Sequence, residues 1–159
     1  AVNWPAGVGG KGNEGVATYV KRIKNTIGYV ELAYALQNKL NHTQLQNREG
    51  QFVSPSLESF AEAAEGADWK GTPGYGVILT NQPGKNAWPI AGATFILVYK
   101  NPSNCSNSRA VLDFFDWSYQ SGAEMARNLD YVPIPKSVYK VMEQGWTNDI
   151  VCNGQSVWK

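Results

Sequence analysis

Residues 93–99 read Ala-Thr-Phe-Ile-Leu-Val-Tyr and form the longest largely apolar run in the chain. The run is rich in β-branched and aromatic residues, which favour strands. It is much shorter than the roughly 20 apolar residues that a membrane-spanning helix needs. We therefore predict a buried β-strand at residues 93–99.

Segments with helical character lie on both sides of this strand. They are predicted at residues 13–24, 31–40, 55–64, 107–120, 123–129 and 135–146. Asn13 is the expected N-cap of the first helix, and Ser54, before Pro55, is the expected N-cap of the third. In the helix at 107–120 the apolar residues share one face, which predicts the side that packs inward: Val111, Leu112, Phe115 and Tyr119.

Shorter extended segments complete the pattern. We predict a strand at residues 27–30 and a hairpin whose arms, 43–46 and 51–53, flank a turn at 47–50. The last dozen residues are polar and predict a loose tail. Strands that alternate with helices are typical of the α/β class.

The stretch 66–89 is rich in glycine and proline and predicts a linker, interrupted by a short apolar run at 76–79. The strands are few and this linker divides them. Two incomplete lobes explain that arrangement better than one closed domain.

Composition excludes several kinds of site. The 14 Lys and Arg residues nearly balance the 13 Asp and Glu residues, and the formal net charge is +1. Without a basic block we expect no nucleic-acid binding, and without a long apolar run we expect no membrane-embedded segment. In the sequence, neither Cys105 nor Cys152 belongs to a CxxC pair or lies near the only histidine, His42, so we expect no metal site.

The two cysteines, Cys105 and Cys152, could form one disulfide that closes a long loop. In the chain-entropy description such a bond contributes about 3–4 kcal/mol to stability. An oxidising compartment outside the cytosol would fit this pairing, but two cysteines are also compatible with the cytosol.

The glycine-rich stretch Gly7-Val8-Gly9-Gly10-Lys11-Gly12 formally matches the GxGxxG fingerprint of dinucleotide-binding loops, with Glu31 at a suitable distance. The fingerprint must follow a buried strand, and residues 1–6 are too short for one and contain Pro5. A flexible loop that leads into a helix is the simpler interpretation. A dinucleotide-binding enzyme fragment remains the third functional alternative.

Residue patterns for catalysis are scarce, and we predict no catalytic residue and no cofactor. His42 lies among polar residues that resemble a surface connection, and no serine stands in a GxSxG motif. Arg109 and Asp113, four residues apart on a predicted helix, fit a solvated ion pair better than an acid–base pair. A sugar-stacking platform of tryptophans is conceivable, but packing explains them more simply: Trp4, Trp69 and Trp88.

Several segments, in order and at matching spacing along nearly all of the chain, resemble the periplasmic phosphate-binding proteins of ABC importers. They are Trp4-Pro5-Ala6-Gly7-Val8-Gly9-Gly10-Lys11-Gly12-Asn13-Glu14-Gly15-Val16, Ile27-Gly28-Tyr29-Val30-Glu31, Ala33-Tyr34-Ala35, Gly66-Ala67-Asp68-Trp69, Trp88-Pro89-Ile90, Ala93-Thr94-Phe95-Ile96-Leu97, Phe114-Phe115-Asp116-Trp117 and Leu129-Asp130-Tyr131-Val132-Pro133-Ile134-Pro135.

The resemblance implies a periplasmic binding protein fold of type 2, of which this chain would be the C-terminal part and span portions of two lobes. Residues 1–83 would complete the second lobe, 84–92 would cross back at the hinge, and 93–159 would rejoin the first lobe. The hinge candidates are Trp88, Pro89 and Ile90. The lobes would close on inorganic phosphate in the complete protein, which would deliver it in the periplasm to the ABC permease subunits.

The family holds phosphate with backbone N–H groups, hydroxyls, an arginine and a carboxylate. Its Ser-Gly-Thr helix start and the nearby arginine precede the point where this chain begins, and Ser121-Gly122-Ala123 only superficially matches that motif. The resemblance therefore assigns no direct phosphate ligand to any residue here. A relative with a non-transport surface or regulatory role is the second functional alternative.

Overall fold

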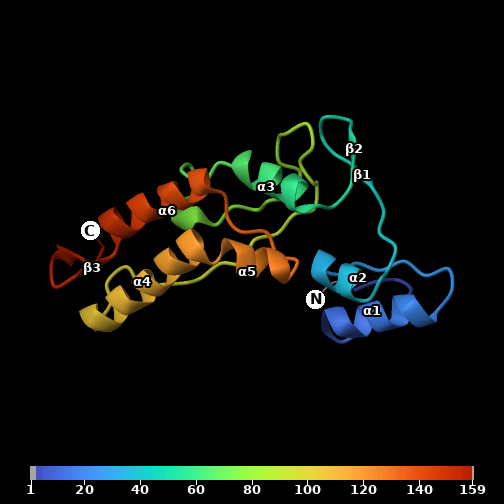
Figure 1. Cartoon of the computed structure of the whole chain (residues 1–159), viewed down its shortest axis with the longest axis horizontal. Coiled ribbons are helices and arrows are strands. Elements are labelled where there is room, and N and C mark those ends of the chain that lie inside the picture. Colours follow the sequence, from blue (N-terminus) through green and yellow to red (C-terminus); the bar gives the residue numbers. More distant parts are fainter. Residues whose placement is uncertain (1–2, 159) are drawn as a thin grey trace. The chain divides into compact units, whose positions relative to one another are not determined.

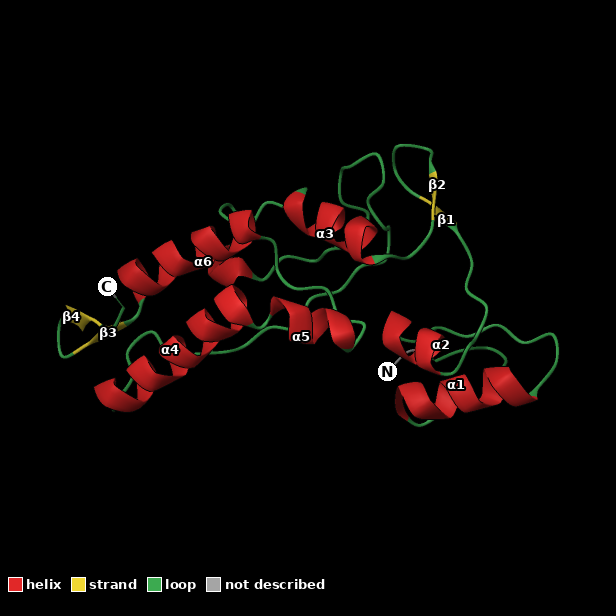
Figure 2. Ribbon diagram, viewed as in Figure 1, coloured by secondary structure: helices red, strands yellow, loops and turns green. Residues whose placement is uncertain are grey.

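A computed structural model describes residues 3–158 (Figure 1). The chain separates into two compact units that divide between Thr43 and Gln44. Figure 2 shows that helices and irregular segments make up most of the chain, with short strands at a few places. Each unit is described by itself below.

The first unit contains two helices, α1 (Gly12–Arg22) and α2 (Leu32–Gln37), close to the predicted positions. Two polar contacts join the α1 side to the start of α2. The Asn13 side chain accepts a hydrogen bond from the backbone N–H of Glu31 at 3.0 Å, and Glu14 accepts one from the Tyr34 hydroxyl at 3.2 Å. Asn13 therefore lies inside α1 and ties α1 to the start of α2, instead of capping α1 as predicted.

Two of the predicted strands are absent. Within residues 3–158, neither 27–30 nor 93–99 joins a sheet. Ile27 is 93% exposed and Leu97 is 92% exposed, although both were expected to be buried. A strand needs a neighbouring strand to bond its N–H and C=O groups, and no described segment takes that position. The prediction of a buried strand at these two places is therefore wrong for this structure.

The second unit begins with the predicted hairpin, which is confirmed. Strands β1 (Leu45–Gln46) and β2 (Phe52–Val53) pair antiparallel, with Leu45 opposite Val53.

Helix α3 (Leu57–Glu65) follows, and its cap corrects the sequence prediction. Ser56, not Ser54, is the N-cap, and Ser56 and Ser59 form a reciprocal capping box. Pro55 lies before the cap instead of in the first helical turn.

Residues 66–89 are irregular, as their glycines and prolines predict, with one short 3₁₀ turn, η1 (Pro73–Tyr75). They nevertheless pack into the main core of the unit and are not a solvated linker. The buried apolar residues of this core are Val53, Ala63, Ala64, Trp69, Val77, Leu79, Ala87, Trp88, Ala91 and Val138.

Three helices complete the described part of the unit and confirm the predicted ones: α4 (Cys105–Ser121), α5 (Ala123–Asn128) and α6 (Lys136–Asp149). The Asn104 side chain caps α4. Leu112 on the predicted inner face of α4 is 1% exposed, but Val111 is 42% exposed, so its assignment to that face is wrong. The rings of Tyr119 and Tyr139, 5.1 Å apart, join α4 to α6.

The C-terminal residues form a hairpin, and the prediction of a loose tail is wrong. Strands β3 (Val151–Cys152) and β4 (Gln155–Ser156) pair antiparallel. Ile150 and Trp158 are buried with Leu112 in a second, smaller core. The polar composition of the tail concealed these anchors, which are apolar residues separated by the turn.

The described chain thus mixes helices with strands, and the two sheets that it contains have two antiparallel strands each. The larger sheet expected of an α/β fold is not formed by residues 3–158. No described helix is both long and apolar enough to cross a membrane.

Candidate functional site at the predicted hinge

The predicted hinge residue Trp88 is firmly anchored. The residue is 7% exposed, and its backbone N–H donates a hydrogen bond to the backbone carbonyl of Ser59 on α3 at 3.0 Å. Its ring lies 6.2 Å from that of Phe60. Trp88 therefore holds the predicted crossover against one face of α3.

Pro89 and Ile90 are bonded to the earlier residues Thr80 and Asn81. The Pro89 carbonyl accepts a hydrogen bond from the N–H of Asn81 at 2.8 Å, and Ile90 forms an isolated antiparallel bridge with Thr80. The three residues thus lie together in one ordered crossing of backbone. Their role as a hinge is not tested by this geometry and stays a prediction.

The side chain of Asn47 organises the entry to this crossing. Asn47 is 6% exposed. Its amide nitrogen lies 3.2 Å from the Gly84 carbonyl oxygen, 2.9 Å from that of Lys85 and 3.3 Å from that of Ala87. One buried amide therefore determines the path of residues 84–87 immediately before Trp88.

The oxygen of the same side chain holds the β1–β2 turn. It accepts hydrogen bonds from the N–H groups of Glu49 at 3.1 Å and Gln51 at 3.0 Å. The sequence indicated only a turn residue at Asn47. Contacts that span 37–40 residues leave no local signal in the sequence.

The glycine-rich loop 7–12 leads into α1, but residues 3–6 before it form no strand. Residues 1 and 2 lie outside the described part of the chain. A Cβ on Gly10 would lie 2.5 Å from the Val16 backbone nitrogen, so close packing of the loop on α1 requires glycine there. Packing explains this glycine, and the described residues lack the strand that a dinucleotide loop follows.

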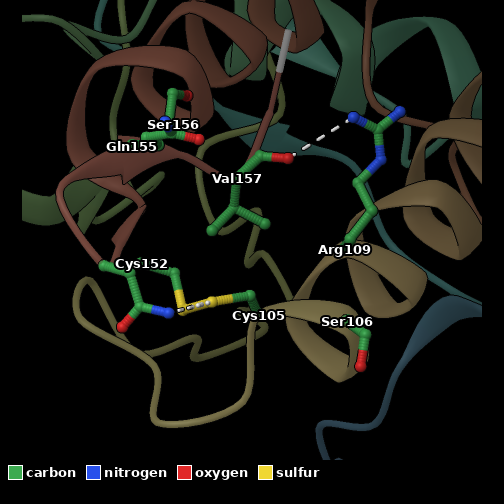
Figure 3. Close-up of a pocket in the computed structure, with 8 residues that line it drawn as sticks. Cys105, Ser106, Arg109, Cys152, Gln155, Ser156 and Val157 are labelled. Carbon is green, nitrogen blue, oxygen red and sulfur yellow. Dashed lines mark hydrogen bonds between the residues drawn. A yellow bond between two sulfur atoms is a disulfide. The ribbon is translucent and has the colours of Figure 1, made fainter.

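Cys105 at the start of α4 and Cys152 in β3 are joined by a disulfide, with Cα atoms 5.6 Å apart (Figure 3). Beside it lies an open pocket of about 600 Å³ between the first turns of α4 and the C-terminal hairpin. The lining residues are Cys105, Ser106, Arg109, Cys152, Asn153, Gln155, Ser156 and Val157.

Arg109 is the charged residue in that lining, and its charge is already paired. It donates to Asp113 at 2.9 Å, in the predicted ion pair, and to the Val157 carbonyl at 3.4 Å (Figure 3). Its guanidinium lies 4.6 Å from the centre of the Trp158 ring. These contacts fix the C-terminal residues to α4 and are structural in character.

The remaining candidates are dispersed. His42 is exposed, as predicted. Trp69 and Trp88 are buried, whereas Trp4 is 64% exposed, so the three do not form a stacking platform. Within residues 3–158, no group of three His, Cys, Asp or Glu residues is placed to hold a metal.

A polar pair that the sequence did not indicate joins α4 and α6. The Tyr139 hydroxyl donates to the Asp116 carboxylate. Burial raises the pKa of Tyr139 well above its usual range, and this hydrogen bond raises it further. The Tyr139 hydroxyl therefore stays protonated near neutral pH, and its hydrogen bond to Asp116 links α4 to α6.

No family model matches the chain. It is 52% identical over 149 residues to a protein of Xylella fastidiosa (strain 9a5c). This match covers 94% of this chain and 41% of that protein. It is 49% identical over 160 residues to a protein of Pasteurella multocida (strain Pm70). This match covers all of this chain and 46% of that protein. A protein of Methanocaldococcus jannaschii is 35% identical over 156 residues, 88% of this chain and 40% of that protein.

All three relatives are named phosphate-binding protein PstS. The matches cover at least 88% of this chain. The chain therefore belongs to the family of phosphate-binding proteins named PstS, and it spans a little under half the length of the relatives that it matches.

Proposed function

We propose that this chain is part of a receptor that binds inorganic phosphate and delivers it to an ABC importer. The observation that carries the proposal is the near 50% identity, over 94–100% of the chain, to proteins named for phosphate binding. Its function would be binding and not catalysis. The relatives' name, phosphate-binding protein, supports binding as the function.

In this proposal the chain corresponds to the C-terminal part of a two-lobed binding protein of type 2. Residues 1–83 belong to the second lobe, 84–92 form the hinge crossing, and 93–159 belong to the first lobe. The bonds of Trp88 to α3 and of Pro89 to Asn81 support a crossing of defined shape. The compact units divide elsewhere, between Thr43 and Gln44, so this lobe boundary is a proposal about the longer protein.

The phosphate ligands would lie in the part of the protein outside these 159 residues. The chain would then contribute the hinge, part of each lobe and surface for the ABC permease subunits. A periplasmic location fits this role and fits the disulfide between Cys105 and Cys152.

The test is a chimera in which this chain replaces the aligned 160 residues of the Pasteurella multocida relative. Calorimetric titration with phosphate should give a saturable binding curve with a Kd in the micromolar range or tighter, which corresponds to a binding free energy of about −8 kcal/mol or stronger. Sulfate should give none, and the unaltered relative is the matched control.

The 159-residue chain alone should give no heat with either anion. A folded chimera that does not bind phosphate would refute the proposed function. Tight phosphate binding by the chain alone would show that ligands lie within it, against the assignment made above.

A further inference from the structure

Tyr75 and Gly145 meet at a point where each residue departs from the usual preference of its local structure. Tyr75, in η1, has a φ of 59°, in the left-handed region that favours glycine. Gly145 is buried in the interior of α6, where glycine weakens a helix relative to alanine. Two unfavourable local features at one contact indicate that the contact itself is required.

The Tyr75 ring occupies the space in which any other residue at position 145 would place its Cβ. A Cβ on Gly145 would overlap the hydroxyl oxygen and ring carbons of Tyr75. The Tyr75 backbone is fixed on both sides, since its N–H donates to the Thr72 carbonyl at 3.1 Å and its carbonyl accepts from the Val77 N–H at 2.8 Å. The half-buried Tyr75 is therefore held in a notch of α6 that glycine creates.

This contact joins segments that the proposed function assigns to different lobes. Tyr75 lies within residues 1–83, and Gly145 lies within 93–159. A second residue of α6, Val138, is 3% exposed and belongs to the main core together with residues of α3. Helix α6 accordingly lies beside α3 (Figure 1). The two proposed lobes thus meet directly through α6.

The contact lies on the packed side of the proposed hinge crossing. Tyr75 packs against the core that contains three residues of that crossing, Ala87, Trp88 and Ala91. A cleft that admits phosphate must be open to water, whereas this side is filled by side chains. When two lobes rotate about a crossing to close a cleft on one side, residues on the opposite side separate. Closure would therefore pull Tyr75 away from Gly145.

We propose that Tyr75, seated on Gly145, is a latch that favours the open receptor and thereby sets its phosphate affinity. The latch rests on the proposed function, from which it takes the lobe boundaries and the phosphate site of the longer protein. A contact made in the open form and lost in the closed form lowers the population of the form that holds the ligand. The observed Kd is the intrinsic Kd divided by that population, so a weaker latch gives tighter binding.

The test measures the Kd for phosphate by calorimetry in the Pasteurella chimera described above. Tyr75→Leu removes the ring, and Gly145→Ala displaces the ring by filling the notch. Each substitution should lower the Kd about fivefold, at the lower end of the usual coupling between two sites. Each should also lower Tm, because packing is lost. Tyr75 touches no ligand in this proposal and is a positioning residue.

Tyr119→Leu is the matched control. The Tyr119 ring lies 5.1 Å from that of Tyr139 and 6.2 Å from that of Trp146, and all three residues belong to the same proposed lobe. Its loss should lower the Tm of the chimera, as Tyr75→Leu does, but leave the Kd unchanged. A merely structural role of Tyr75 would likewise change Tm alone.

An unchanged Kd in folded Tyr75→Leu and Gly145→Ala chimeras would overturn the proposal, as would an equal change in Kd from Tyr119→Leu. A higher Kd would overturn it by placing the contact on the cleft side. Failure of both variants to fold would overturn it by making the contact a condition of the fold. The unaltered chimera separates the two proposals: without phosphate binding the proposed function fails and the latch with it, whereas binding that neither variant changes refutes only the latch.

Discussion

Replacing Asn47 with alanine tests how the entry to the predicted hinge is held in place. The side chain is 6% exposed and bonds to residues in two segments that are far apart in sequence. The variant removes all of these bonds and leaves the backbone of the turn free to adopt the same shape. We expect the free energy of unfolding to fall by about 3 kcal/mol.

That magnitude follows from the surroundings of each lost bond. The N–H groups of Glu49 and Gln51 belong to exposed residues and can bond to water, so their loss costs about 0.5 kcal/mol each. The carbonyl of Ala87, a residue with no exposed surface, loses its donor inside the core. A buried acceptor without a partner costs about 1–3 kcal/mol, and about 2 kcal/mol brings the sum to 3.

Urea unfolding followed by tryptophan fluorescence measures this loss. Asn86→Ala is the matched control, because Asn86 lies in the same loop, is exposed, and uses only its backbone N–H, which donates to Glu62. Its effect should be within about 0.5 kcal/mol of zero. Equal effects of the two substitutions, or a loss below about 1 kcal/mol for Asn47→Ala, would refute the role given to this amide.

Asn47→Asp tests separately the role of the Asn47 amide nitrogen as hydrogen-bond donor. The aspartate keeps the acceptor for the turn but turns a carboxylate oxygen toward three carbonyl oxygens. Burial and those oxygens would raise the pKa of the introduced carboxyl above its unfolded value of about 3.9. The penalty is therefore small below that value and grows as the pH rises through the raised pKa, so the variant should be less stable at neutral than at acidic pH. A loss that does not depend on pH would contradict this.

Three further outcomes are expected. Ser56→Ala should cost about 1 kcal/mol by removing the α3 capping box, while Ser54→Ala should cost less than about 0.5 kcal/mol; equal costs in urea unfolding would contradict the observed cap. Replacing Cys105 and Cys152 with serine should cost about 4 kcal/mol, from the 47-residue separation, and thiols titrated in the unreduced protein would contradict the bond. Burial and Asp116 raise the pKa of Tyr139, so the contribution of this hydroxyl to stability is present below about pH 10 and lost as the pH rises above it. Thermal unfolding of Tyr139→Phe should show a smaller loss of stability at alkaline pH than the unaltered chain. Identical pH profiles of the two proteins would contradict this role of Tyr139.

The helices could be predicted from the sequence because the signals for a helix are local. Apolar spacing and capping residues lie within a few positions of each other, and the helices from α1 to α6 occur close to the predicted places. The error at α3 is a choice between two serines on either side of Pro55, which local propensity does not decide. The exposed Val111 shows that an apolar helix face does not reveal which partner covers it.

The β1–β2 hairpin was predicted correctly, but the predictions of strands at 27–30 and 93–99 were wrong for a different reason. An apolar run such as 93–99 predicts a strand, but the strand exists only where a partner segment supplies hydrogen bonds. The C-terminal hairpin did have a signal, Asn153-Gly154, which favours a two-residue turn; both residues have positive φ, of 52° and 78°. The three contacts of Asn47 with residues 84–87 had none, because the amide meets these residues only after the chain has folded.

The disulfide turns residues 105–152 into a covalent ring that contains α4, α5 and α6 entirely. A protease that cuts once between α5 and α6 would therefore release nothing, and the two pieces would migrate as one species until reduced. The ring also imposes an order on biosynthesis, since Cys105 cannot reach its partner until the ribosome has made Cys152, 47 residues later. Until that moment α4 must persist by its own packing or remain unfolded.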